Sequence, residues 1–73
     1  MASKTRIQRA IADFTQAAKF DHGNYLIYIH RAEANEHKGD RDSAVSDYRR
    51  ALTLAPEKNI SDKIKVTLKR LGF

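Results

Sequence analysis

The feature that most constrains this chain is a partial internal repeat. Six pairs of similar residues lie 34 positions apart: Ala10 and Ala44, Ile11 and Val45, Asp13 and Asp47, Phe14 and Tyr48, Ala17 and Ala51, and Phe20 and Leu54. Within each copy the small and apolar residues recur at intervals of three and four, which is typical of one face of an α-helix. Self-similarity at this period indicates stacked helical units, so the sequence predicts an all-α fold.

A longer pattern runs from Tyr25 to Pro56. Small, aromatic and turn-forming residues occupy fixed offsets within it: Tyr28, Ala32, Gly39, Ala44, Tyr48, Ala51 and Pro56. The pattern resembles the tetratricopeptide repeat family, which implies antiparallel helical hairpins, as in a fragment of an α-solenoid, with about four helices in one small domain. The resemblance divides the 73 residues into a second helix of a partial repeat (5–22), a complete repeat (25–56) and a C-terminal capping helix (59–71).

A steric argument explains these residue types. Two helices approach closely only where small side chains meet, so Ala32 and Ala44 are expected at the crossing, and Gly39 permits the turn between the helices. Aromatic rings then fill the space beside the crossing, and Pro56 ends the unit because it cannot continue a helix. The alternative is an ordinary helical bundle whose core happens to contain alanines and tyrosines.

The helix expected over 25–38 departs from the family at two positions. Arg31 and Asn35 stand where leucine and tyrosine are usual, which leaves open how this helix packs against its neighbours. In the helix expected over 41–54, charged residues are predicted to point mostly outward: Asp42, Asp47, Arg49 and Arg50. Residues suited to capping lie near the helix starts: Ser3 or Thr5, Asn24, Asp40 with Ser43, and Asn59 with Ser61. Phe73 is expected to fold back after Gly72.

The first helix carries a wide apolar face. In the family this helix would pack on a preceding partner helix, so some of four residues should lack an intrachain partner: Ile7, Ala10, Phe14 and Ala17. Exposed apolar surface of this kind usually marks an interface. Either the segment belongs to a longer array, which we favour because arrays need about three repeats, or the chain forms a homo-oligomer through this face.

The family resemblance also implies a groove that binds a peptide or helix of a partner protein. Carried onto this sequence, its candidate residues are Leu26, Ile29, Glu33, Glu36, Lys63 and Arg70, with Ile60 and Thr67 at the remaining positions of the closing helix. Members that clamp a C-terminal carboxylate have Lys and Asn where this chain has Ile29 and Glu33, so that ligand is not expected. An amphipathic or mixed-charge partner suits the groove better. The alternative is that these are ordinary surface positions.

The net charge of +5 suggests an alternative function, in which the chain is a small basic domain that binds nucleic acid. Basic residues cluster on the last helix: Lys58, Lys63, Lys65, Lys69 and Arg70. No aromatic residue is interleaved with them as a stacking platform, so a solvated helix face is the preferred interpretation and nucleic acid is not the expected partner.

No enzyme is expected, because the sequence has no phosphate loop, nucleophile elbow or paired catalytic acids. No cofactor or metal is expected either. His30 and His37 lie seven residues apart, about 10 Å along a helix, which is too far for one ion, and a solvated Glu33–His37 pair is predicted instead. No apolar run could cross a bilayer, so a soluble protein is expected, with the cytoplasm as its preferred location; the absence of cysteine indicates no redox compartment.

Overall fold

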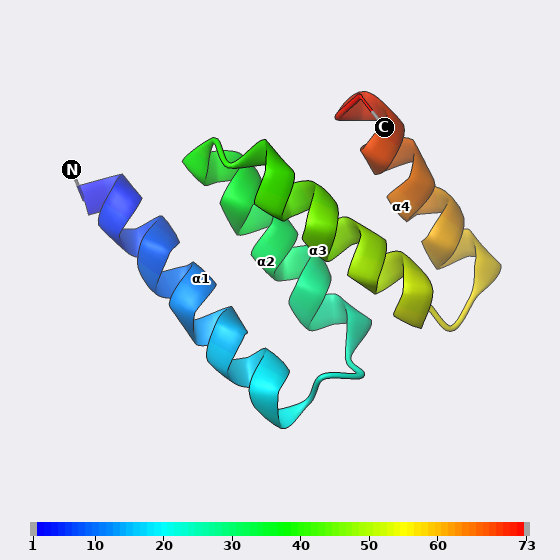
Figure 1. The fold of residues 1–73 in the computed structure, drawn as a ribbon, viewed down its shortest axis with the longest axis horizontal. Helices are drawn as coiled ribbons and strands as arrows, with labels where there is room; N and C mark the ends of the chain where they lie inside the picture. Colours follow the sequence, from blue (N-terminus) through cyan, green and yellow to red (C-terminus); the bar gives the residue numbers. More distant parts are fainter. Residues whose placement is uncertain (1, 73) are drawn as a thin grey trace.

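The structure is a computed structural model that describes residues 2–72, with side chains from residue 6 onward. Over this range the chain forms four helices and no strand (Figure 1): α1 (Ala2–Phe20), α2 (Tyr25–Lys38), α3 (Arg41–Leu54) and α4 (Lys58–Arg70). The predicted all-α fold is confirmed. Within the same range, no helix combines the length and the apolar character that a bilayer span requires.

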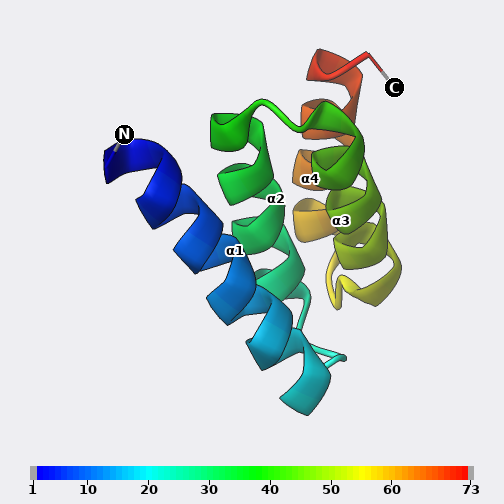
Figure 2. The same cartoon turned by 60° about the vertical axis from the view of Figure 1, so that its left-hand side comes forward.

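Each helix runs antiparallel to the one before it and packs against it (Figures 1 and 2). The four helices lie side by side in a layer that measures 38 × 30 × 15 Å. Close backbone contacts join each described helix only to its neighbours in the chain, so the row of helices does not close into a bundle. Both faces of the layer are therefore open to solvent.

The bounds predicted for α2 and α3 are confirmed, because local capping fixes them. The Asn24 side chain accepts a hydrogen bond from the Leu26 backbone N–H at 3.1 Å and starts α2. Gly39 follows α2 with a φ of 90°, a conformation that glycine adopts without a steric penalty. The backbone N–H of Asp40 then reaches the Asn35 carbonyl at 2.8 Å, and the Asp40 side chain accepts from the Ser43 backbone N–H at 3.1 Å to start α3.

The outer helices begin earlier than predicted. α4 starts at Lys58, with Glu57 at its N-cap and no capping side-chain bond, so Asn59 does not cap the helix. Asn59 already lies within the first helical turn, and Ser61 donates its hydroxyl to the Lys58 carbonyl at 2.9 Å instead. α1 starts at Ala2, and the side chains of Ser3 and Thr5, like Phe73, lie outside the described residues.

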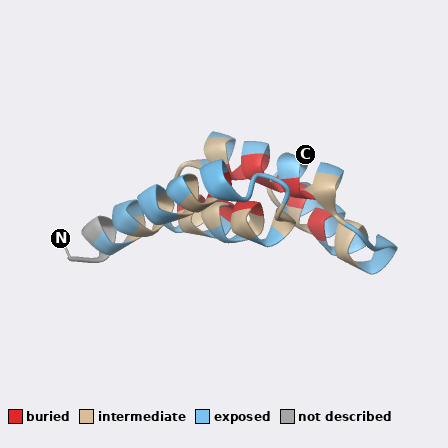
Figure 3. Cartoon of the chain, turned by 90° about the horizontal axis from the view of Figure 1, so that it is seen from below, coloured by how far each residue is buried: buried red, intermediate tan, exposed pale blue. Residues whose placement is uncertain are grey.

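The core lies where α2, α3 and α4 pack (Figure 3). Ala32, Ala44 and Ala51 have no exposed surface, as expected for small residues at a helix crossing. Tyr28 and Tyr48 are also buried, and Ile64 and Leu68 contribute from α4: all seven belong to one apolar cluster. Among the described side chains of α1, only Ala18 is buried. α1 therefore buries less of its surface in the layer than α2 or α3.

Candidate functional site

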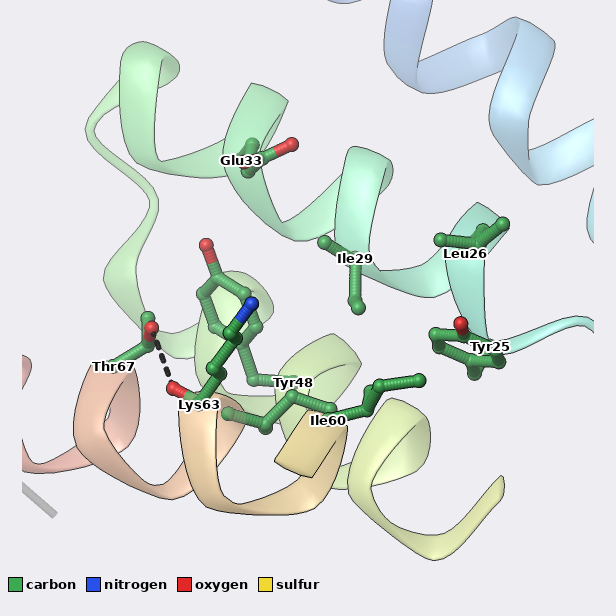
Figure 4. Close-up of a pocket in the computed structure, with 9 residues that line it drawn as sticks. Tyr25, Leu26, Ile29, Glu33, Tyr48, Ile60, Lys63 and Thr67 are labelled. Atoms are coloured by element: carbon green, nitrogen blue, oxygen red, sulfur yellow. Dashed lines mark hydrogen bonds between the residues drawn. The ribbon is translucent and has the colours of Figure 1, made fainter. Parts of the chain in front are cut away.

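A solvent-accessible groove of about 280 Å³ lies between α2 and α4, with Tyr48 of α3 among its lining residues (Figure 4). From α2 it is lined by Tyr25, Leu26, Ile29 and Glu33, and from α4 by Ile60, Lys63, Ile64 and Thr67. Four of the six predicted groove residues therefore come together: Leu26, Ile29, Glu33 and Lys63. The other two, Glu36 and Arg70, bind to each other.

The two walls of the groove carry residues 34 positions apart. Leu26 and Ile60, Ile29 and Lys63, and Glu33 and Thr67 are such pairs, and all six residues line the groove. The ion pair between Glu36 and Arg70 also spans 34 positions, with Oε1 and Nη2 2.9 Å apart. The period seen in the first two-thirds of the sequence thus extends in space to α4, where the amino-acid similarity is too weak to reveal it.

One end of the groove is apolar and the other is polar. Leu26 and Ile29 lie toward the apolar end, near Tyr25 and Ile60, and Glu33 lies toward the polar end near the Tyr48 hydroxyl (Figure 4). Leu26 is 46 % exposed and lies beside the other apolar residues of this end, so it extends their apolar surface to solvent. The groove therefore offers apolar surface to another molecule, with hydrogen-bonding and charged groups at one end.

The polar end is fixed by a three-residue network. Tyr48 donates its hydroxyl to Glu36 Oε2 at 2.5 Å, while Arg70 holds the other oxygen of the same carboxylate. Burial alone would raise the pKa of Glu36, but the hydrogen bonds from Tyr48 and Arg70 outweigh it and lower that pKa. Burial, followed by the bond to Glu36, raises the pKa of Tyr48. At neutral pH Glu36 is thus a carboxylate and Tyr48 a neutral donor.

Glu33 does not pair as predicted. The carboxylate lies 3.3 Å from Nδ1 of His30, one turn before it, rather than beside His37. Both partners of the His30–Glu33 pair are about half exposed, so Glu33 keeps room to contact a ligand in the groove. Across the described residues, no three His, Cys, Asp or Glu side chains are grouped so as to hold a metal ion.

Sequence reasoning missed a second polar cluster, on the other side of α2. Arg31 makes two hydrogen bonds to Asp47, at 2.9 Å from Nε and 2.7 Å from Nη2, and Asn35 donates to the same carboxylate at 3.3 Å. Asp47 is 6 % exposed, so the prediction that it points outward is wrong. Its charge is tolerated in the interior because Arg31 neutralises it and both of its oxygens accept hydrogen bonds.

This cluster also connects α1 to the rest of the fold. Arg31 donates from Nη1 to the Thr15 hydroxyl at 3.3 Å, and the four side chains border a polar hollow of about 370 Å³. The two residues that depart from the family pattern, Arg31 and Asn35, are thus the ones that bind Asp47. The sequence contained a signal for this cluster. Arg31 and Asn35 lie four residues apart and so share one face of α2, and Asp47 has a matching aspartate 34 positions earlier, at Asp13.

The four candidates for self-association are half-buried: Ile7, Ala10, Phe14 and Ala17. Phe14 is not without an intrachain partner, because its ring stacks on the His30 imidazole with 5.8 Å between ring centres. A larger apolar exposure in α1 is at Phe20, which is 82 % exposed. The basic residues of α4 are all exposed, but Arg70 is bound to Glu36 and Lys63 lines the groove.

Comparisons with protein-family models, with curated proteins and with solved structures return no match to this chain. The features of this chain that bear on its function are the groove, the two polar clusters and the 34-residue register.

Proposed function

We propose that this chain is a non-catalytic, tetratricopeptide-like interaction module that binds a short amphipathic segment of another protein in the groove between α2 and α4. The observation that carries this proposal is the apolar groove lining, in which exposed Leu26 and half-buried Ile29 lie beside Glu33 and Lys63. A bound segment would place apolar side chains against Leu26 and Ile29, and its polar end near Glu33 and Lys63.

The size of the groove favours a protein segment over a small molecule. Small-molecule sites usually have volumes of about 300–1,000 Å³ and enclose most of the ligand. This groove, at about 280 Å³, lies at the lower end of that range and is not enclosed. It can hold one or two large side chains, which is what an anchoring residue on a partner helix or extended peptide requires.

The polar end supports specificity rather than strength. Glu36, Tyr48 and Arg70 satisfy one another, so a partner need not neutralise them in order to bind. Glu33 and Lys63 are the charged groups in the groove lining, and they carry opposite charges. A partner with both charges at its polar end is therefore favoured over one with a single sign.

The test is selection from a random-peptide display library, followed by affinity measurement by fluorescence anisotropy. We expect peptides with apolar residues three or four apart, whose affinity falls roughly tenfold or more in the Leu26→Glu variant because an apolar contact is lost. Val66→Glu is the matched control, since it adds the same charge at an exposed apolar residue that does not line the groove. Selected peptides that bind Leu26→Glu as well as the native chain would refute the proposal.

The same variants separate this function from nucleic-acid binding. Labelled RNA and DNA oligonucleotides should bind weakly at about 150 mM salt if the groove is the functional site. Tight binding that falls steeply between about 50 and 200 mM salt, and that Leu26→Glu leaves unchanged, would favour the basic face of α4 instead.

A further inference from the structure

α1 leaves partly open the face that corresponds to the covered face of α3. On α3, Asp47 and Tyr48 hydrogen-bond to side chains of α2, and Ala44 beside them has no exposed surface. Their counterparts 34 positions earlier are Asp13, Phe14 and Ala10. Asp13 is exposed and the other two are half-buried. The place that α2 occupies on α3 is therefore open on α1 within the described part of the chain.

α4 has the complementary property. On α2, the residues that meet α3 include Arg31, Ala32 and Asn35, and their counterparts on α4 are Lys65, Val66 and Lys69. All three counterparts are exposed, and Val66 is 67 % exposed. α4 thus presents to solvent the face with which α2 holds α3, on the side away from the groove.

The ion pair that joins α2 to α3 has a counterpart of the same charges on these two open faces. In the α2–α3 pair, cationic Arg31 binds anionic Asp47. The same register brings cationic Lys65 opposite anionic Asp13, and Lys69 takes the place of Asn35 beside it. Within one chain α1 and α4 lie at opposite edges of the layer, so these residues meet only between copies (Figure 1).

We infer that copies of this chain associate head to tail, with the outer face of α4 docked on the open face of α1 in the next copy, as α2 docks on α3. Lys65 then pairs with Asp13, and Val66 lies at the crossing against Ala10. This assembly goes beyond the proposed function and uses different faces, so the groove stays free. Because the two faces differ, a docked pair still has one free face at each end, and further copies add to it in an open chain or, where the rotation between copies closes, in a ring.

Two differences between α4 and α2 make this contact weaker than the contact between α2 and α3. Val66 is larger than its counterpart Ala32, which widens the crossing. Asp62 stands at the position of Tyr28 and removes an aromatic ring from the contact. The assembly therefore depends on concentration instead of being permanent.

Sedimentation equilibrium of the full chain over a wide concentration range tests the inference. We expect the weight-average mass to rise past that of a dimer as the concentration increases. D13K and K65E should each require roughly tenfold higher concentration for the same mass, since like charges then face each other. All the substituted residues are exposed, and circular dichroism verifies that each variant is folded.

Mixing the two variants is the decisive arm. In a mixture of D13K and K65E, copies of the two variants can alternate. One contact then has the ion pair with its charges exchanged, and the next contact has native Lys65 beside native Asp13, so association should return. Lys63→Glu, the same charge change on the groove side of α4, should leave association unchanged. A monomer at all concentrations, a plateau at the dimer mass, or no recovery on mixing would overturn the inference. Leu26→Glu should not affect the assembly. A negative result for self-association can therefore be told apart from a negative result for peptide binding in the groove.

Discussion

The guanidinium group of Arg31 and the carboxylate of Asp47 meet through two parallel hydrogen bonds, with Nη2 and Oδ1 2.7 Å apart. This fork joins α2 to α3 at a point where only 8 % of the Asp47 side chain is exposed. Such a planar, two-point contact fixes the rotation of one helix against the other as well as their distance. Arg31 stands at the position where the tetratricopeptide pattern usually has a leucine.

Arg31→Leu should lower the free energy of unfolding by about 3 kcal/mol. The substitution removes the counter-charge and leaves the buried Asp47 carboxylate with Asn35 as its remaining partner. Urea denaturation followed by circular dichroism at low protein concentration measures the change.

The control is the double variant Arg31→Leu/Asp47→Leu. It should be less destabilised than Arg31→Leu alone, because no unpaired carboxylate remains in the interior. Single and double variants whose effects simply add would mean that Arg31 and Asp47 are not coupled.

The Glu36–Tyr48 pair predicts how stability depends on pH. The folded pKa of Glu36 lies below its ordinary value of 4.5, so its stabilising effect is complete above that pH and is lost as pH falls through the lower folded value. The folded pKa of Tyr48 lies above its ordinary value of 10.0, so its effect is complete below that pH and is lost as pH rises through the folded value. Stability should therefore be greatest between these limits.

Glu36→Gln isolates the acid limb of this profile. At neutral pH it should cost about 1 kcal/mol, because a charge-assisted hydrogen bond becomes a neutral one at a partly exposed site. The difference from the native chain should shrink when denaturation is repeated at about pH 3. Asp62→Asn removes an exposed carboxylate elsewhere on α4 as a comparison, and an equal pH response in both variants would count against the pair.

Ala44→Leu should destabilise the fold by about 1–3 kcal/mol through overpacking. Ala44 has no exposed surface in the cluster that joins α2 and α3, so added methyl groups must push the helices apart. Thermal denaturation compares it with Ala12→Leu, the same change at an exposed position of α1. An unchanged melting temperature for Ala44→Leu would contradict the close crossing.

Gly39→Ala and Gly23→Ala should have opposite effects. Gly39 has a φ of 90°, so alanine there is strained by about 1–2 kcal/mol although nothing lies within 4 Å of its added Cβ. Gly23 has no positive φ and the same open space, so alanine should be neutral or stabilise by up to about 1 kcal/mol. Equal effects in chemical denaturation would rule out the conformational explanation.

The sequence was sufficient to predict where α2 ends and α3 begins, because the residues of the turn cap the two helices. Gly39 ends α2 in a left-handed conformation, and the Asp40 side chain caps the start of α3. It was less accurate for α4, whose N-cap, Glu57, makes no side-chain bond, so composition gave no sign of the boundary. Local reasoning works where a short segment satisfies its own backbone groups.

The 34-residue repeat was sufficient to predict which residues line the groove, but not which of the predicted residues bind each other. Leu26, Ile29, Glu33 and Lys63 share the groove as the repeat implies. That Glu36 and Arg70 would bind each other depends on the spacing of α2 and α4, which the sequence does not state. Asp47 was misplaced for the same reason, because its environment is set by Arg31, 16 residues earlier in the chain.

Close backbone contact in the described chain is confined to consecutive helices, so no helix must wait for a distant segment before it can pack. Such local connectivity favours rapid folding that starts in the central α2–α3 pair and spreads outward. The two edges are then the first parts to open. Amide hydrogen exchange should be slowest near Ala32 and Ala44 and fastest toward the start of α1, a gradient of protection along the molecule rather than one uniform value.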